Sequence, residues 1–502
     1  MTAIRTQVVP DSGVKTAAPA LEPLLIEIHE AGRAGRHVRG SEDADALIPN
    51  EFRRRASLDL PEITEPQVVR HFTHLAQLNY AVDTGMYPLG SCTMKYNPKV
   101  NDRIAALAGF AEIHPRQDDD TIQGALRLMF ELQELLAKLT GMDAATLQPA
   151  AGAHAEFTAL LVFKAYHSKR GDAARRRRVI VPDTAHGTNP ASAAMCGYTV
   201  TTVKSDSRGN IDLASLKAAL GDDVVGLMLT NPNTLGLFEE RLREVCDAVH
   251  NAGGLVYGDG ANMNALLGVA RPGDLGFDCI HINVHKTFST PHGAGGPGAG
   301  PLCVKAKLEP FLPHPRTTRD TDGSYRRGPT PPDSIGRVRS FFGNFGVLVR
   351  AYTYIRTLGE EGLAEASNDA ILAANYLLAQ LRDSYDVAFD RPCMHEFVAS
   401  AKTLRRERKI SAMEIAKRLL DFGYHAPTVY FPLVVPEALM IEPTETEPRE
   451  TLDAFAAAMV RVAERAKTDP ASVKAAPLHA PLARLDEVSA ARYPRLRWQR
   501  PT

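Results

Sequence analysis

The segment that decides the fold spans residues 279–300 and reads CIHINVHKTFSTPHGAGGPGAG. Apolar residues at Ile280, Ile282 and Val284 predict a buried strand that ends just before Lys286. Small residues follow, and glycine lets backbone approach a ligand closely because it has no Cβ. An amine shielded from water in such a place can attack a carbonyl, as a Schiff-base lysine attacks the aldehyde of pyridoxal phosphate (PLP). A purely structural loop has the same appearance, so this segment alone leaves both interpretations open.

Short apolar segments alternate with helical patterns on both sides of Lys286. The expected strands cover residues 179–181, 199–203, 224–230, 255–259, 279–283 and 302–304, and the expected helices between them cover 213–220 and 239–252. Farther upstream, apolar spacing predicts a helix over 122–139 that Gly141 ends. Alternation of this kind predicts an α/β fold with a mostly parallel sheet covered by helices on both faces. Ligands bind such sheets at the carboxyl ends of the strands.

Three polar residues follow expected strands: Asn231, Asp259 and Lys286. Upstream, the small-residue turn Ala151-Gly152-Ala153 precedes a helix expected over 157–165, and free N–H groups at a helix N-terminus suit a phosphate. A carboxylate that closes a strand also commonly caps a helix, and a plain loop-to-helix junction resembles the small turn. PLP needs a phosphate cradle, a partner for its phenolic oxygen, an acid beside its ring nitrogen and a lysine, and the chain offers candidates for all four.

Composition excludes several classes of protein. The chain has 502 residues with 44% hydrophobic and 23% charged residues, and its formal net charge is -1, which gives no general attraction to nucleic acid or to an anionic membrane. No apolar run reaches the roughly 18 residues of a membrane span, and the N-terminus lacks the apolar core of a secretory signal. The six cysteines show no metal-binding spacing. We therefore expect a reduced, cytoplasmic protein without a metal site.

The length predicts a large domain and a smaller one. Residues 1–65 have little periodicity and are expected to form an extended arm, with a flexible tail as the alternative. Residues 66–358 should form a large PLP-binding α/β domain, with a long irregular loop at 315–337. Residues 359–502 should form a small C-terminal α+β domain and tail.

Six motifs together resemble a known family, subunit 2 of glycine dehydrogenase (decarboxylating), which is the P-protein of the glycine cleavage system. They lie at residues 87–99, 148–156, 183–192, 230–238, 259–264 and 283–301. The resemblance covers the chain from about residue 60 to its end and implies the fold-type I architecture of PLP enzymes.

The resemblance also implies a role for each site residue. Lys286 holds PLP as a Schiff base, and Asp259 pairs with its ring nitrogen. Asn231 approaches the phenolic oxygen, and His186 stacks on the ring and belongs to the catalytic set. The turn at 151–153 holds the phosphate.

The implied reaction is the PLP-dependent decarboxylation of glycine, with transfer of the aminomethyl group to the lipoyl group of the H-protein, an oxidoreductase activity. Because this chain resembles only the PLP-bearing half of a family that some organisms carry on one longer chain, the resemblance implies a companion subunit 1 and an α2β2 heterotetramer. Nucleic acid and membrane are not expected partners.

Two other interpretations remain. The first is a different fold-type I enzyme, either an amino-acid decarboxylase or a cysteine desulfurase, which would need a mobile nucleophilic cysteine; Cys92 is the single candidate. The second is a catalytically silent partner subunit that keeps the fold only as an interaction surface. The presence of both Lys286 and Asp259 argues against a silent subunit.

Overall fold

The computed structural model describes residues 21–33, 35, 47–56, 58, 60–291 and 298–497. Contacts divide the chain into two compact units, one made of residues 1–85 and 476–502 and the other of residues 86–475. The predicted domain boundaries at residues 65 and 358 follow the sequence pattern and stay predictions.

The first unit contains η1 (Asn50–Phe52), α2 (Glu65–Leu78) and α17 (Glu487–Arg492). Within the predicted arm, Glu62 joins two distant segments, because its backbone N–H donates to Nδ1 of His29 at 2.8 Å and its carboxylate accepts the N–H of Gly32 at 2.6 Å. Much of the predicted arm, including residues 1–20, lies outside the described residues.

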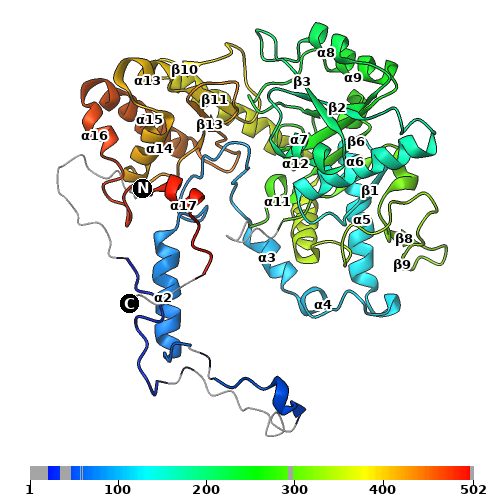
Figure 1. Cartoon of the computed structure of the whole chain (residues 1–502), viewed down its shortest axis with the longest axis horizontal. Helices are drawn as coiled ribbons and strands as arrows, with labels where there is room; N and C mark the ends of the chain where they lie inside the picture. Colours follow the sequence, from blue (N-terminus) through cyan, green and yellow to red (C-terminus); the bar gives the residue numbers. More distant parts are fainter. Residues whose placement is uncertain are drawn as a thin grey trace. The chain divides into compact units, whose positions relative to one another are not determined.

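The second unit is built on a seven-stranded sheet with the order β1-β7-β6-β5-β4-β2-β3 (Figure 1). Its strands are β1 (Ala144–Thr146), β2 (Arg178–Pro182), β3 (Thr199–Val203), β4 (Val224–Thr230), β5 (Leu255–Gly260), β6 (Cys279–Ile282) and β7 (Leu302–Val304). Strands β3, β2, β4, β5 and β6 pair in parallel, whereas β7 is antiparallel to both β6 and β1. The mostly parallel sheet predicted from the sequence is confirmed, with β1 as an additional edge strand.

Helices cover both faces of this sheet. The helices of this part of the unit are α3 (Lys99–Ala105), α4 (Ala108–Ala111), α5 (Gln123–Thr140), α6 (Gly152–Lys169), α7 (Thr188–Met195), α8 (Leu213–Ala219), α9 (Leu242–Asn251), α10 (Pro272–Leu275) and α11 (Val284–Thr287), with 3-10 turns η2 (Asp119–Thr121) and η3 (Ala306–Phe311). Successive residues of β4 enter different cores: Leu227 and Leu229 pack with α5, α8 and α9, and Val225 and Met228 pack with α6 and α7. This two-sided burial explains why β4 is apolar along its whole length.

The long helix α12 (Phe345–Leu381) contains a break at Gly359, where φ is 66° and ψ is -170°. Glycine adopts this left-handed backbone without the steric cost that a Cβ would add. The break therefore divides α12 into two helical segments, one against the large sheet and one against the smaller sheet.

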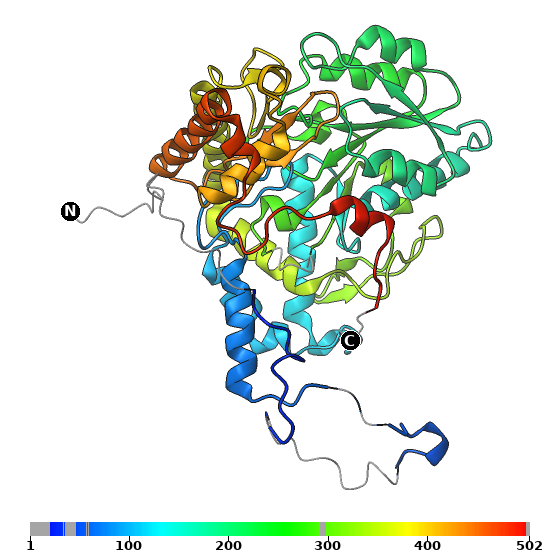
Figure 2. The same cartoon turned by 60° about the vertical axis from the view of Figure 1, so that its left-hand side comes forward.

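The smaller sheet is antiparallel with the order β10-β11-β13-β12. Its strands are β10 (Asp386–Val387), β11 (Phe397–Ser400), β12 (Thr428–Val429) and β13 (Ala438–Ile441), and its helices are α13 (Lys402–Arg408), α14 (Ala412–Asp421), α15 (Arg449–Thr468) and α16 (Pro470–Lys474). Leu419, Leu439 and Phe455 are fully buried in its core. Figures 1 and 2 both show this layer beside the larger sheet.

Part of the loop predicted at 315–337 is regular instead. Strands β8 (Thr317–Arg319) and β9 (Tyr325–Arg327) form a hairpin, so the prediction of a wholly irregular loop is wrong. Two side chains of α5 hold the hairpin: Gln133 donates to the Thr317 carbonyl at 2.9 Å and Gln123 donates to the Tyr325 carbonyl at 2.7 Å. These bonds connect residues about two hundred positions apart, which local patterns do not reveal.

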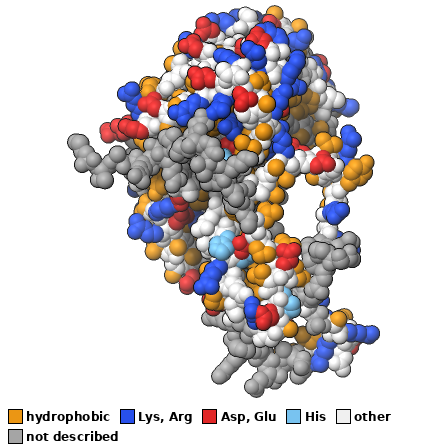
Figure 3. Space-filling model, turned by 90° about the vertical axis from the view of Figure 1, so that its left-hand side faces the viewer, with side chains coloured by type: hydrophobic (Ala, Val, Ile, Leu, Met, Phe, Trp, Pro, Cys, Tyr) orange, Lys and Arg blue, Asp and Glu red, His pale blue; other side chains and the backbone are white. Residues whose placement is uncertain are grey.

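The described surface carries charges of both signs. Figure 3 shows basic and acidic side chains interspersed over the upper part of the view, in keeping with a formal net charge of -1. Among the described residues, no helix is both long and apolar enough to span a membrane. All six cysteines, each in the described part of the chain, are free thiols.

The core between α5 and the large sheet provides a test of the packing described above. Leu132 is fully buried, so Leu132→Ala should lower the free energy of unfolding by about 2–5 kcal/mol through lost contacts and a residual cavity. Leu372 is 68% exposed, and Leu372→Ala should change it by less than about 0.5 kcal/mol. Urea denaturation of both variants gives the comparison, and equal effects would contradict the described core.

Candidate active site

Parallel pairing brings the carboxyl ends of three strands together. The register places Thr230 of β4 beside Asp259 of β5, and Asp259 beside His281 of β6. Lys286 lies in α11, which begins directly after β6. Residues from three separate stretches of sequence therefore meet at one edge of the sheet.

A cavity of about 130 Å³ opens at this edge. Its walls come from both sheets and from the loop before α3. The lining residues are Ser91, Gly152, Ala153, Glu156, His186, Thr188, Thr230, Pro232, Thr234, Asp259, Ala261, Asn262, Asn283, Lys286, His395 and Glu396. Five of the seven residues predicted for the site are among them, and Ala151 and Asn231 are not.

The N-terminus of α6 forms one wall of the cavity. No side chain caps it, so the first N–H groups of the helix remain available beside Gly152 and Ala153. A Cβ on Gly152 would lie 2.5 Å from Oδ1 of Asn283 and 3.0 Å from Nε2 of His281. A Cβ at this position would therefore force the Asn283 side chain to shift, and an anion at this helix end would meet free N–H groups and the positive end of the helix dipole.

Asp259 is a buried carboxylate with compensating partners. Asn189 donates to Oδ2 at 3.1 Å and the N–H of Ala261 donates to Oδ1 at 3.0 Å, while Nε2 of His281 lies 3.7 Å from Oδ1. Burial by itself raises the pKa of Asp259, but His281, Asn189, Ala261 and Lys286 together hold it below its ordinary value. Asp259 therefore stays ionised in the cavity wall.

Glu156 lines the cavity together with Asp259 and was not predicted from the sequence as a site residue. It accepts hydrogen bonds from Thr188 at 2.7 Å and from Asn189 at 2.9 Å, and the same amide nitrogen of Asn189 also donates to Asp259. Burial and the Asp259 charge raise the pKa of Glu156 to about 7. Glu156 thus holds the proton of this carboxyl pair, which leaves Asp259 as the charged member.

His186 is exposed at the cavity and is joined to the same network. Its Nδ1 lies 2.8 Å from the hydroxyl of Thr188, which in turn donates to Glu156. The His186 ring also makes an edge contact with Phe431, with 5.7 Å between ring centroids. The imidazole ring is therefore held in the cavity wall by Thr188 and Phe431.

Asn231 lies directly after β4. Its Oδ1 accepts the backbone N–H of Glu239 at 2.9 Å, so the side chain supports the turn after β4 and is not part of the cavity lining. The preceding residue, Thr230, does line the cavity, and its hydroxyl is buried without a hydrogen-bond partner. Asn231 as a partner of a ligand oxygen stays a prediction, and Thr230 is a second candidate that sequence reasoning missed.

Lys286 contacts the loop that precedes α3. Its ammonium group donates to the Ser91 carbonyl at 2.7 Å, which fixes the end of the side chain in the cavity. The glycine-rich run after Lys286 was predicted to let backbone approach a ligand, but residues 292–297 lie outside the described part of the chain.

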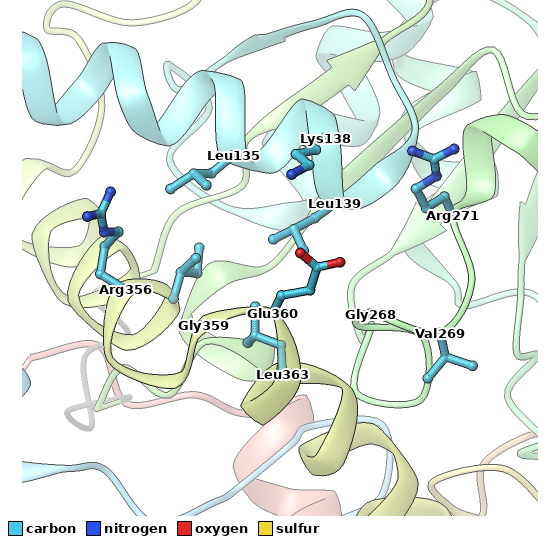
Figure 4. Close-up of a pocket in the computed structure, with 11 residues that line it drawn as sticks. Leu135, Lys138, Leu139, Gly268, Val269, Arg271, Arg356, Gly359, Glu360 and Leu363 are labelled. Carbon is cyan, nitrogen blue, oxygen red and sulfur yellow. The ribbon is translucent and has the colours of Figure 1, made fainter.

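A larger cavity of about 540 Å³ lies elsewhere, beside the break in α12. Figure 4 shows its lining side chains from α5, from the loop at 268–271 and from both sides of Gly359. It shares no lining residue with the smaller cavity. The smaller cavity collects the lysine and the buried acids, and for that reason it is the candidate active site.

Comparison with known proteins identifies the family. A family model for the glycine cleavage system P-protein matches residues 38–323, and a model for the C-terminal domain of glycine dehydrogenase matches residues 366–480. The chain belongs to the glycine cleavage system P-protein family. The resemblance found in the sequence motifs is thereby confirmed.

Individual P-protein relatives match along nearly the whole chain. The probable glycine dehydrogenase (decarboxylating) subunit 2 of Caldanaerobacter subterraneus is 57% identical over 452 residues, which cover 90% of this chain and 93% of the relative. The corresponding protein of Desulforamulus reducens is 55% identical and covers 95% of this chain and 99% of the relative.

A solved P-protein structure has the same fold. The inhibitor-bound glycine decarboxylase of the glycine cleavage system superposes with a TM-score of 0.68 at 24% identity and covers 84% of this chain and 95% of the other. The predicted α/β architecture is therefore confirmed.

The Glu156 proton provides a pH test on the chain without added ligands. Because its pKa is about 7 in the folded chain and ordinarily 4.5, the folded state binds more protons between these values, and stability falls as pH rises through them. Relative to Glu156→Gln, the wild type should lose on the order of 1–3 kcal/mol of unfolding free energy between about pH 5 and about pH 7.5.

The control for this test is Glu365→Gln, at an exposed position of α12, which should follow the wild type. Urea denaturation at both pH values measures the difference. A Glu156→Gln variant with the pH dependence of the wild type would show that Glu156 is ionised throughout.

Proposed function

We propose that this chain is the PLP-bearing subunit 2 of glycine dehydrogenase (decarboxylating). It decarboxylates glycine and transfers the aminomethyl group to the lipoyl group of the H-protein, an oxidoreductase reaction. The observation that carries the proposal is the joint position of Lys286 and the ionised Asp259 in one cavity of a P-protein family member.

The cavity fits PLP on three independent points. The uncapped end of α6 at Gly152 and Ala153 offers N–H groups for a phosphate, Asp259 offers a buried charge for a pyridinium, and Lys286 offers an amine for the aldehyde. When bound there, PLP supplies an electron sink for the pair left on the α-carbon as CO2 departs.

The residues of the chain divide this work among them. Lys286 would hold the aldehyde carbon, and the negative charge of Asp259 would favour a proton on the ring nitrogen. The N–H groups at Gly152 and Ala153 would hold the phosphate, and Ala151 shapes the turn before them. These are local tasks of binding and orientation.

Two further side chains complete the predicted set. His186 would pack on the ring face, and it could move protons at its other imidazole nitrogen, because its Nδ1 is used by Thr188. The phenolic oxygen of PLP has two candidate partners, the predicted Asn231 and the unpaired hydroxyl of Thr230.

The alternative enzymes and the silent subunit are less well supported. A cysteine desulfurase needs a reactive thiol, but burial raises the pKa of Cys92, and the nearby Lys286 only partly offsets that effect. Burying an ionised acid in the same cavity as a lysine costs free energy. A catalytically silent subunit would gain no activity from this arrangement.

The proposed partners follow from the reaction. The chain works with a companion subunit 1 in an α2β2 heterotetramer, and a lipoylated H-protein brings the disulfide to the cavity. We place the assembly in the cytoplasm, in keeping with six free thiols in the described chain. We expect no metal, nucleic acid or membrane to take part in this reaction.

The lysine assignment is tested by borohydride reduction of the PLP-loaded chain followed by peptide mapping. The label should lie on Lys286, and Lys286→Ala should lose the label and glycine decarboxylation while it keeps its fold, because the change removes an amine from a cavity wall. Lys169→Ala, at a 64% exposed lysine paired with Asp333, should behave as the wild type. Label on another lysine would refute the assignment.

The need for partners is tested by exchange of the glycine carboxyl group with labelled bicarbonate. We expect the chain alone to be nearly inactive and the activity to rise at least tenfold when both the companion subunit and lipoylated H-protein are added. A self-sufficient homodimer is the opposing outcome. Full exchange from this chain with H-protein alone would refute the heteromeric assembly and leave the lysine chemistry intact.

A further inference from the structure

Two glutamates and a histidine from the smaller sheet meet beside Lys286, and none of them was predicted from the sequence. Glu396 directly precedes β11, Glu442 directly follows β13, and the pairing of Phe397 with Ile441 places the two glutamates next to each other. One side-chain nitrogen or oxygen atom from each of His395, Glu396 and Glu442 lies within 4.8 Å of the other two. The three residues are 1%, 3% and 0% exposed.

The hydrogen bonds around this pair are unequal. Glu442 accepts from the hydroxyl of Thr93 at 2.7 Å and from the amide of Asn262 at 2.8 Å, one bond for each carboxylate oxygen. Glu396 accepts the N–H of Ser91 at one oxygen, at 2.6 Å. Since hydrogen bonds to both oxygens favour the ionised form, Glu442 is the better place for a negative charge and Glu396 for a proton.

The electrostatics agree with this division. Burial and the Glu442 charge raise the pKa of Glu396 to about 8. Burial also raises the pKa of Glu442, but the hydrogen bonds from Thr93 and Asn262 oppose this and the value is about 7. His395 is neutral because burial, together with Lys95 and Lys286, lowers its pKa to about 3. Near neutral pH the cluster therefore holds a carboxylic acid that can give up a proton.

Glu396 also has access to the reacting atoms. It lines the same cavity as Lys286, and Ser91 connects the two, because its N–H donates to Glu396 and its carbonyl accepts from the lysine ammonium. Glu442 is not part of the lining, so its charge acts on the cavity through its effect on Glu396. A proton on Glu396 can therefore reach a group in the cavity, as general acid catalysis requires.

We infer that Glu396 is the general acid that protonates the sulfur released when the acceptor disulfide opens. This inference rests on the proposed function, which supplies both glycine and the lipoyl disulfide. The leaving sulfur needs a proton because a thiolate next to the buried acid pair is poorly stabilised and can attack the new carbon–sulfur bond.

The step balances without an outside oxidant. The carbon–carboxylate bond breaks, CO2 leaves, and the electron pair on the substrate carbon forms a bond to one sulfur. The sulfur–sulfur bond breaks, its pair goes to the second sulfur, and that sulfur takes the proton of Glu396. Over the cycle Glu396 regains a proton from the substrate ammonium group, so the carbon is oxidised, the disulfide is reduced and the amine leaves neutral.

The first test reads the proton of Glu396 in the chain without PLP. Infrared spectra of the wild type at about pH 7 should show a carboxylic-acid band that Glu396→Gln lacks. Glu447→Gln is the matched control, because burial raises the pKa of Glu447 to about 7, yet Glu447 does not line the cavity. An identical carboxylic-acid signal in the wild type and Glu396→Gln would overturn the inference, as would a metal ion that the wild type holds and Glu396→Gln loses.

The second test measures single-turnover transfer in the PLP-loaded assembly with lipoylated H-protein. Glu396→Gln should slow transfer by roughly 10²–10⁴-fold, Glu396→Asp should restore part of the rate, and Glu447→Gln should match the wild type. The wild-type rate should fall as pH rises through about 8, and Glu396→Gln should lack that decrease. The charged or titratable groups that face Glu396 are Glu442, His395, Lys286 and Cys92.

The two proposals fail in different ways. If the wild-type assembly neither releases CO2 from glycine nor forms the aminomethyl product, the proposed function is wrong. If the wild type is active and Glu396→Gln transfers at the same rate with the same pH profile, the proposed function stands and the role of Glu396 is wrong.

Discussion

The buried charge of Asp259 is the constraint on which the large sheet and its cavity depend. An ionised carboxylate in a protein interior is stable only when neighbouring groups replace its hydration. Here the replacement comes from Asn189 on α7, from the backbone after β5 and from His281 on β6. Since each partner belongs to a different element, the requirement fixes α7, β5 and β6 relative to one another, and α11 carries Lys286 from the end of β6.

The cavity has a pair of acids on each of two sides. At the large sheet Glu156 carries a proton and Asp259 is ionised, and at the smaller sheet Glu396 carries a proton and Glu442 is ionised. The geometry therefore separates a permanently charged acid from a proton-bearing one within one cavity, which is a common way to run acid and base steps at the same pH.

Local sequence was sufficient for the parts of the site that lie at strand ends. Lys286 and Asp259 each follow an apolar run, so their positions at the sheet edge could be predicted from the pattern alone. The pattern could not show that Thr230, at the end of β4, lines the cavity beside the predicted Asn231, because adjacent residues of a strand face different directions.

Contacts between distant residues account for what the sequence did not reveal. Glu396 and Glu442 become neighbours only through pairing of β11 with β13, and Glu156 meets Asp259 only through Asn189. The hairpin of β8 and β9 depends on glutamines of α5 in the same way. The pair His395-Glu396 directly before the apolar run at 397–399 is a local feature that could have drawn attention to the second cluster.

The central claim is that this sheet edge binds PLP with its phosphate against Gly152. The most direct measurement is a PLP titration of the purified chain, followed by visible absorbance where protein groups do not absorb. We expect saturation at one equivalent for the wild type and for Gly124→Ala, whose added Cβ meets open space, and at least tenfold weaker binding for Gly152→Ala, whose added Cβ meets Asn283. Binding by Gly152→Ala as tight as that of the wild type would contradict the claim.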